Sequence, residues 1–279
     1  MAKLVAIDID GTLLTSAQMI SPATRAAIRE VLDRGVRVVL VTGRSFPHAR
    51  PFAEELGLTT PLILHNGALV KDVAGRVFDA RLLDAETARE IIGRARAQRM
   101  DLIAFDDPDG DGQAVVETIA PENERLRRYL SRWQRPAASV PDLWRYVDHP
   151  VLALTTVDRW EKACRFADAI EREFRGRARV WRTEYPRRDM ALLDFVSPES
   201  SKARALDRLA RRWDIAPSEI MVVGDNRNDV EMFAYAGLGV VMGNAEEELK
   251  ALGDYVTGTN DEDGLAQALR RFVLGEVLS

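Results

Sequence analysis

The feature that most constrains the fold of this chain is a set of short, almost wholly apolar runs, each closed by polar or turn-forming residues. Runs of this length, rich in β-branched residues and bounded by glycine, predict buried strands. Strands that are apolar on both faces are typical of parallel sheets with helices on each side. The runs, with the residues that close them, are Leu4–Ile9 with Asp10-Gly11, Val36–Val41 with Thr42-Gly43-Arg44, and Ile220–Val223 with Gly224-Asp225.

Amphipathic segments lie between these runs and predict helices. Ser21 precedes Pro22, a pair that favours an N-cap followed by the first helical residue. Apolar residues then recur on one face until Gly35, where the helix is expected to end. A second helix over 46–56 and a strand over Pro61–Leu64 continue the alternation. The chain therefore opens as a doubly wound α/β domain.

From Leu83 the pattern changes to strands in pairs with helices between them, which predicts an α+β unit. The first pattern returns after the run Met190–Val196, so we expect one domain to interrupt another. The predicted division is a core of residues 1–82 and 189–279 and an inserted domain of 83–188. The elements expected in the insertion are helices at 85–97, 123–133 and 159–174, strands at 102–105, 114–117 and 151–155, and a hairpin loop at 106–112.

Composition excludes several functional classes. The chain has 279 residues and a net charge of -5, so no global positive field is available for nucleic acid or an anionic membrane. No segment approaches the ~20 apolar residues of a membrane span. Carboxylates interrupt the first apolar run, and Cys164 is the only cysteine. We expect a cytoplasmic protein, monomeric or homodimeric, with a small-molecule partner.

Polar residues concentrate where the predicted parallel strands end, which is where doubly wound sheets bind ligands. Asp8 and Asp10 are two apart in an extended segment and can address the same point. Asp225 follows a later strand. Carboxylates without a histidine cluster favour a hard cation, and Mg²⁺ is the usual one beside phosphate.

These residue types suit phosphoryl transfer, which needs an in-line nucleophile and neutralisation of the phosphoryl oxygens. Asp8 is the predicted nucleophile, forming an aspartyl-phosphate, and Asp10 the acid and base for the leaving group and the water. The remaining assignments are Thr42 and Asn228 as hydrogen-bonding groups for the phosphate, Lys202 as its positive charge, and Asp225 as a metal ligand supported by Asp229.

The ordered set resembles the four motifs of the haloacid dehalogenase superfamily. Those motifs are Asp8-Ile9-Asp10-Gly11-Thr12, Val41-Thr42-Gly43-Arg44, Lys202, and Gly224-Asp225-Asn226-Arg227-Asn228-Asp229. Within the superfamily the chain is similar to the Cof-type phosphatases, through His65-Asn66-Gly67-Ala68 and Met242-Gly243-Asn244-Ala245. One departure is Ala203 after Lys202, where the family usually has glycine.

The resemblance implies a Rossmann-like doubly wound parallel sheet with an inserted α+β cap. It also implies magnesium-dependent hydrolysis of a small phosphorylated metabolite, such as a sugar phosphate, through an aspartyl-phosphate. The residues that match the motifs are then Asp8 and Asp10 for catalysis, Thr42, Gly43, Arg44, Lys202 and Asn228 for phosphate, and Asp8, Asp10, Asp225 and Asp229 for the metal.

Alternatives remain at this point. A phosphosugar mutase would use the same core and cap, and a non-catalytic sensor of phosphorylated ligands would keep the fold. The charged segment from Arg182 to Arg188 could contact substrate, but a solvated linker is the favoured interpretation. His48, His65 and His149 show no ligand spacing and are not expected to be catalytic.

Overall fold

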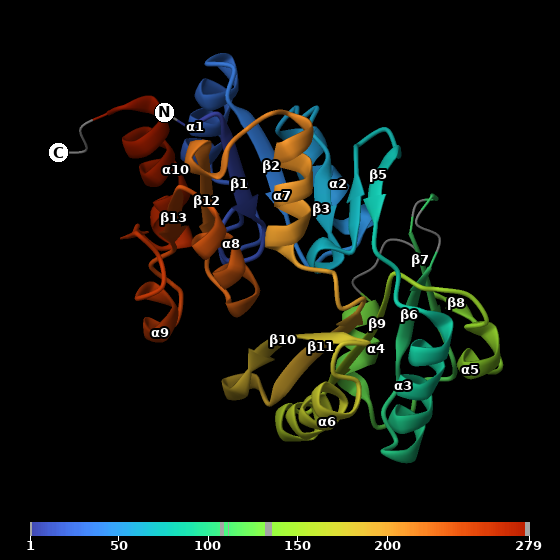
Figure 1. Cartoon of the computed structure of the whole chain (residues 1–279). Coiled ribbons are helices and arrows are strands. Elements are labelled where there is room, and N and C mark those ends of the chain that lie inside the picture. The colour runs from blue at the N-terminus through green and yellow to red at the C-terminus, as the bar shows by residue number, and fades with distance from the viewer. Residues whose placement is uncertain (1, 107–108, 111, 132–135, 277–279) are drawn as a thin grey trace. The chain divides into compact units, whose positions relative to one another are not determined.

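The computed structural model describes residues 2–106, 109–110, 112–131 and 136–276. The chain divides into two compact units, each built on its own sheet (Figure 1). The first unit comprises Met1–Arg44, Ala49–Phe78 and Ser201–Ser279, and the second comprises Ser45–His48 and Asp79–Ser200. One unit thus interrupts the other, as the sequence pattern predicts.

The first unit is built on an eight-stranded sheet in the order β14-β13-β12-β1-β2-β3-β4-β5. The strands from β14 to β3 pair in parallel, and β4 turns back antiparallel to β3. The bounds are β1 Leu4–Asp8, β2 Arg37–Val41, β3 Leu62–Leu64, β4 Leu69–Lys71, β5 Val77–Ala80, β12 Ile220–Gly224, β13 Leu238–Val241 and β14 Tyr255–Val256.

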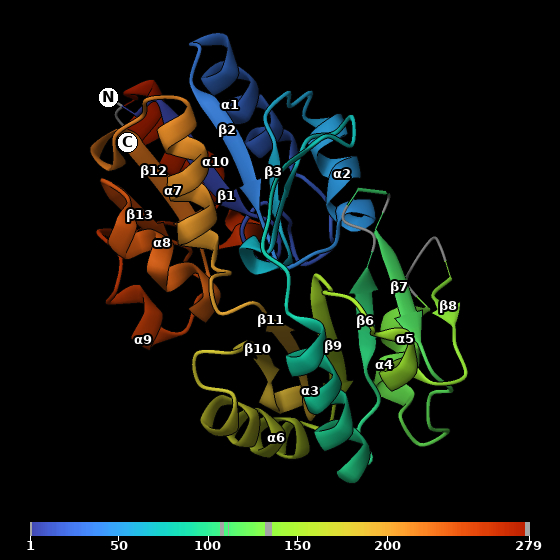
Figure 2. The same ribbon diagram turned by 45° about the vertical axis from the view of Figure 1, so that its right-hand side comes forward.

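Helices cover both faces of this sheet, with α7 and α8 on one side and α1 and α10 on the other (Figures 1 and 2). Ser21 caps α1 by accepting the Thr24 N–H, and Pro22 is its first residue, as predicted. The bounds are α1 Pro22–Asp33, α2 Phe46–Glu55, α7 Lys202–Arg212, α8 Val230–Tyr235, α9 Glu247–Lys250 and α10 Gly264–Leu269.

The strand order reverses at β1, because β2 and β3 follow it on one side while β12 and β13 lie on the other. At such a switch point the connections leave in opposite directions and open a crevice at the carboxyl ends of the strands. Asp8 is the last residue of β1 and Asp225 directly follows β12. The fold therefore brings the first and last sequence motifs to one place.

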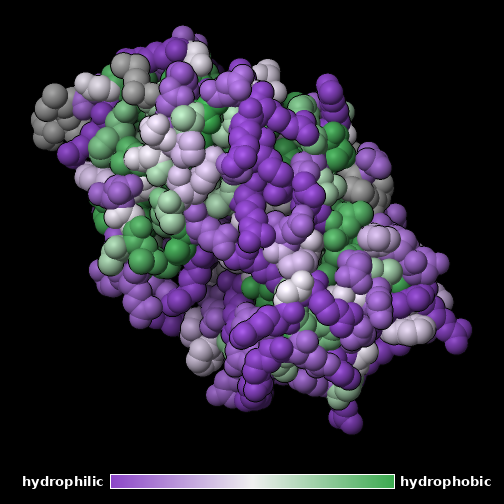
Figure 3. All heavy atoms as spheres, viewed as in Figure 1, coloured by the Kyte–Doolittle hydropathy of each residue, from purple (hydrophilic) through white to green (hydrophobic). Residues whose placement is uncertain are grey.

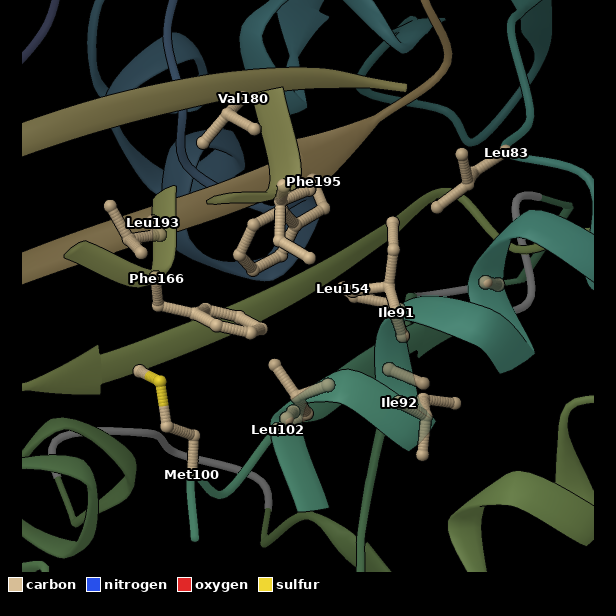
Figure 4. Packing of buried hydrophobic residues seen from close by; sticks show 14 of the residues in the cluster. Leu83, Ile91, Ile92, Met100, Leu102, Leu154, Phe166, Val180, Leu193 and Phe195 are labelled. Atoms are coloured by element: carbon tan, nitrogen blue, oxygen red, sulfur yellow. The ribbon is translucent and has the colours of Figure 1, made fainter. Parts of the chain in front are cut away.

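The second unit has a six-stranded sheet in the order β10-β11-β9-β6-β7-β8. Helices α3 and α6 pack on it through the apolar cluster drawn in Figure 4, where Phe166 of α6 meets Phe195 of β11 edge to face. The bounds are α3 Ala85–Ala97, β6 Ile103–Asp106, β7 Gln113–Val116, α4 Glu124–Leu130, β8 Ala138–Ser139, α5 Leu143–Tyr146, β9 Ala153–Asp158, α6 Trp160–Glu173, β10 Arg179–Tyr185 and β11 Met190–Val196.

The bounds of this unit differ from the expected 83–188. It begins at 79 and includes residues 45–48, and it ends at 200 because the strand Met190–Val196 pairs with β9 and β10. The interpretation of residues 182–188 as a solvated linker is wrong. Residues 182–185 belong to β10, and residues 186–188 form the turn from β10 to β11. Arg182 is held there by Asp168 and Glu171 of α6.

The loop expected at 106–112 connects β6 to β7, which pair antiparallel and confirm the hairpin. Residues 107, 108 and 111 of that loop lie outside the described residues. In the part of the chain that the structure describes, no helix is long and apolar enough to cross a membrane. The face in Figure 3 is dominated by hydrophilic residues, in keeping with the composition.

A histidine in the second unit allows a test of its electrostatics. His149 contacts Asp106 through Nε2 at 2.7 Å and Asp148 through Nδ1 at 2.9 Å, so both ring nitrogens face carboxylates. The hydrogen bond with Asp148 raises the pKa of His149, although partial burial opposes the shift, and Asp106 adds to it. A raised folded-state pKa gives stability that is complete below the unfolded pKa and is lost as pH rises through the folded pKa.

We therefore expect His149→Gln to destabilise the protein more at about pH 5.5 than at about pH 8.5, on either side of the ordinary histidine pKa. Urea unfolding of both proteins at the two pH values measures the difference. Asp148→Asn keeps the imidazole and removes one of its two carboxylate partners. Its loss of stability should also be larger at the lower pH, but the difference between the two pH values should be smaller than for His149→Gln. An equal loss at both pH values would contradict the charged state of His149.

Candidate active site

A buried lysine lies at the carboxyl end of β1. Lys202, the first residue of α7, is 1% exposed and donates from Nζ to Asp8 Oδ1 at 2.6 Å and to Asp229 Oδ1 at 2.7 Å. Asp8 and Asp229 are themselves buried. An ammonium in this position is stable only with charged partners. The pairing therefore fixes three distant segments of the chain to one another.

Asp229 is held on both of its carboxylate oxygens. Oδ1 accepts from Lys202, and Oδ2 accepts the main-chain N–H groups of Asp225 and Asn226 at 3.1 and 3.0 Å. A side chain at Gly224 could not be accommodated, since its Cβ would lie 2.5 Å from Asp229 Cγ. These contacts shape the loop after β12.

Asp8, Asp225 and Asp229 each offer a carboxylate oxygen, and the three oxygens lie within 4.8 Å of one another. Among the described residues this is the acidic group with metal-ligand spacing. Three carboxylates face one ammonium, so the cluster carries an excess of negative charge. All-oxygen donors with that excess fit a divalent hard cation.

The protonation of the cluster reflects this excess. Burial raises the pKa of Asp8 to about 7, because the repulsion from Asp229 and Asp10 adds to it and Lys202 offsets only part. Burial likewise raises the pKa of Asp225, with Asp8 the next contributor. The pKa of Lys202 is raised, since attraction to Asp229 and Asp8 outweighs the opposing effect of burial. A cation bound here would favour the ionised carboxylates.

Asp225 is oriented by the turn after β1. Gly11 has φ +79°, and a Cβ there would lie 2.1 Å from Asp225 Oδ2. Asn244 donates from Nδ2 to Asp225 Oδ2 at 3.2 Å and to the Gly11 carbonyl at 2.9 Å. Sequence reasoning assigned Asn244 no role, and its only signal was its place in the Met242-Gly243-Asn244-Ala245 motif.

Asp10 and Arg44 form a pair that the sequence does not predict. The half-exposed Asp10 carboxylate accepts from Arg44 Nε at 2.8 Å and from Nη2 at 2.6 Å. Such two-point contacts are strong and directional. Arg44 also donates to Gln18 Oε1 at 2.9 Å, so its guanidinium contacts protein groups in this structure.

Thr42 and Asn228 lie on another side of the site. Thr42 is buried, and its Oγ1 accepts the Arg44 main-chain N–H at 3.0 Å. Asn228 donates from Nδ2 to Asn66 Oδ1 at 2.9 Å. The structure thus brings together Asp8, Lys202, Asp225 and Asp229. It also links Asn228 to Asn66 in the segment after β3, and the only sequence signal for Asn66 is its place in the motif His65-Asn66-Gly67-Ala68.

The fold and the site together have the features of a phosphoryl-transfer enzyme: a doubly wound sheet, an acidic cluster at its switch point, and a second α+β unit inserted in the chain. The family model for haloacid dehalogenase-like hydrolases matches residues 5–269. The chain belongs to that family.

Relatives cover nearly the whole chain. Phosphatase YwpJ of Bacillus subtilis is 30% identical, over 97% of this chain and all of the relative. The 5-amino-6-(5-phospho-D-ribitylamino)uracil phosphatase YcsE of the same organism is 31% identical, over 98% of this chain and 96% of its own. A haloacid dehalogenase-like hydrolase from Bacteroides thetaiotaomicron has a TM-score of 0.82 at 27% identity, covering 97% of this chain and 99% of its own.

These comparisons confirm the family, the Rossmann-like core with an inserted α+β cap, and the enzyme class of phosphoric monoester hydrolase. They leave the non-catalytic alternative without support.

The buried pairing predicts a large stability effect. Lys202→Met leaves two buried carboxylates without their ammonium, which costs on the order of 3–5 kcal/mol. We expect this loss in urea unfolding with the metal chelated. It should be larger at about pH 8 than at about pH 6, because Asp8, with its raised pKa, is protonated at the lower pH.

Lys3→Met is the matched control, since Lys3 pairs with Glu219 but is 61% exposed. Removing a pair of that kind changes stability by roughly 0–1 kcal/mol. Adding Asp229→Asn to Lys202→Met should recover part of the loss, because one uncompensated charge disappears. If the two lysine variants had equal effects, the buried pairing would not be a stabilising element.

Proposed function

We propose that the chain is a magnesium-dependent phosphomonoester hydrolase that acts on a small phosphorylated metabolite through an aspartyl-phosphate at Asp8. The observation that carries the proposal is the buried Asp8 carboxylate, held by Lys202 at 2.6 Å within an acidic cluster at the switch point of the sheet. A carboxylate fixed in this way is presented in one orientation, which nucleophilic attack requires.

The contacts favour one oxygen of Asp8 as the nucleophile. Lys202 already donates to Oδ1 of Asp8, so Oδ2 is the oxygen that would attack phosphorus. The bond from phosphorus to the ester oxygen breaks, and the leaving oxygen takes a proton. Water then attacks phosphorus, the bond to Asp8 breaks, and inorganic phosphate leaves with the Asp8 carboxylate restored. Lys202 would neutralise the phosphoryl oxygens throughout.

Asp10 is the proposed source of the leaving-group proton and the base for the water. Its carboxylate is bound at two points by Arg44, so Asp10 must separate from the guanidinium to act. A bound phosphate would compete for Arg44, which is the phosphate-binding role that the motif implies for this arginine. Substrate binding would thereby release Asp10 for proton transfer.

The metal set follows from the negative charge of the acidic cluster. Asp8 and Asp225 are the proposed direct carboxylate ligands of Mg²⁺, with Asp10 beside them. Asp229 supports the set through its hydrogen bonds with Lys202 and with the main chain of Asp225 and Asn226. When bound, Mg²⁺ would neutralise charge on the phosphoryl group. Thr42, the Gly43 main chain and Asn228 would hold the remaining phosphate oxygens.

The substrate class is drawn from the relatives. Their names specify phosphatases for HMP-PP in Serratia proteamaculans, for pyridoxal phosphate in Escherichia coli, and for a phosphoribitylaminouracil in Bacillus subtilis. We propose a substrate of similar size for this chain, a sugar phosphate or a comparable phosphorylated metabolite. Such metabolites are cytoplasmic, which is the location we propose. The second unit would act as the cap that selects the leaving group.

Asp8→Asn tests the nucleophile. The amide keeps the shape of the side chain but cannot form an acyl phosphate, so turnover of p-nitrophenyl phosphate should fall by on the order of a thousandfold or more. Circular dichroism should show an intact fold. The exposed Asp214→Asn is the control and should retain full turnover. Residual activity within about tenfold of wild type would argue against covalent catalysis at Asp8.

Metal exchange tests the cation. Chelation should abolish hydrolysis, added Mg²⁺ should restore it, and Ca²⁺ should restore little. Ca²⁺ takes more ligands at longer distances and would misplace the phosphoryl group relative to Asp8. Initial rates on the same ester with each ion measure this. Equal rates with the two ions would remove the geometric basis of the argument.

A further inference from the structure

The turn after β3 has an unusual backbone. His65, Asn66 and Gly67 are consecutive and have φ values of 46°, 54° and 93°. Left-handed conformations are rarely adopted by residues other than glycine, and asparagine is among the few that tolerate them. Strain of this kind persists where the surroundings impose it, and it concentrates at functional sites.

The main chain of this turn is hydrogen-bonded to the segment after β2. The Asn66 N–H donates to the Thr42 carbonyl at 3.0 Å, and the His65 N–H donates to the Arg44 carbonyl at 3.1 Å. Gly67 lies against the start of α7, where a Cβ would be 2.2 Å from the Ser201 carbonyl oxygen. The same turn therefore contacts the segment of Thr42 and the segment of Lys202.

The Asn66 side chain reaches a third segment. Asn66 is 2% exposed, and its Oδ1 accepts from Asn228 Nδ2 at 2.9 Å. Its amide also lies against Gly43, where a Cβ would be 3.1 Å from Nδ2 and 3.2 Å from Oδ1. Among the described residues, no other hydrogen bond orients the Asn228 amide, and the Asn228 Oδ1 atom is buried without a partner.

An amide nitrogen carries two N–H groups. Asn66 accepts one from Asn228, which fixes the amide plane and leaves the second available to an anion. We infer that Asn66 is a positioning residue for phosphate, acting through the Asn228 side chain and the Thr42 main chain. This inference rests on the proposed function, in which Asn228 and Thr42 bind the phosphoryl group.

Two substitutions separate this role from a structural one. Asn66→Gly accepts the left-handed backbone and removes the amide. Asn66→Asp keeps the shape, tolerates the same backbone and can still accept from Asn228, but it places a negative charge one hydrogen bond from the anion site. The probe is orthovanadate, a phosphate analogue, measured as an inhibitor of p-nitrophenyl phosphate hydrolysis in the presence of Mg²⁺.

We expect the inhibition constant for orthovanadate to rise roughly 10- to 100-fold in Asn66→Gly, the scale of a lost hydrogen bond to a charged group. It should rise at least about tenfold in Asn66→Asp, because a negative charge near the anion site repels the vanadate. Asn66→Gly combined with Asn228→Ala should bind orthovanadate no more weakly than Asn228→Ala alone, because the Asn66 side chain acts through Asn228 and glycine keeps the main-chain N–H that contacts Thr42. The control is Asp214→Gly, another left-handed position that is exposed, and it should match wild type.

Thermal unfolding of each variant accompanies these measurements. Lowered stability with an unchanged orthovanadate constant in both variants would show a structural role and overturn the inference. Multiplicative losses in the double variant would overturn the route through Asn228. If Asn66→Gly does not fold, an unchanged constant in Asn66→Asp still overturns the inference. A wild-type protein that neither hydrolyses the ester nor binds orthovanadate would instead overturn the proposed function, and the inference with it.

Discussion

The buried ammonium of Lys202 is the interaction on which the rest of the site depends. It joins the end of β1, the start of α7 and the loop after β12 through Asp8 and Asp229. None of these groups is stable in the interior alone, so each segment must be in place for the others to ionise. The parallel strands on either side of β1 supply that arrangement, since their carboxyl ends meet at one edge of the sheet.

The site divides its charges between two tasks. On one side, Asp8 and Asp225 carry more negative charge than Lys202 offsets, and their raised pKa values reflect that imbalance. On the other side, the Thr42 carbonyl accepts from the Asn66 N–H, and the Asn228 side chain donates to Asn66 Oδ1. A phosphate ester bound between them would meet attraction from a cation and directional hydrogen bonds from rigid amides, and such preorganisation is an effective source of transition-state stabilisation.

Local patterns predicted much of this structure. The apolar runs, the Ser21 cap and the strand-end carboxylates are properties of neighbouring residues, and each appears where the sequence placed it. The contacts that escaped prediction join distant residues. The strand β10 is charged because it lies at the edge of its sheet, where Arg182 pairs with Asp168 of α6. Asp10 forms a salt bridge with Arg44 between two different loops. The register of β10 and the Asn66–Asn228 hydrogen bond could not be predicted, because neither produces a periodic pattern in the sequence.

Every residue proposed for the chemistry lies in the first unit, whereas the second unit has an independent core built on its own sheet. Under the proposed function, substitutions in that core or on its surface would change what is bound without disturbing the Asp8–Lys202 pair. Relatives near 30% identity that bear the names of different phosphatases are consistent with this separation. The chain crosses between the units at 44/45, 48/49, 78/79 and 200/201, and the last crossing directly precedes Ser201, the N-cap of the helix that begins at Lys202.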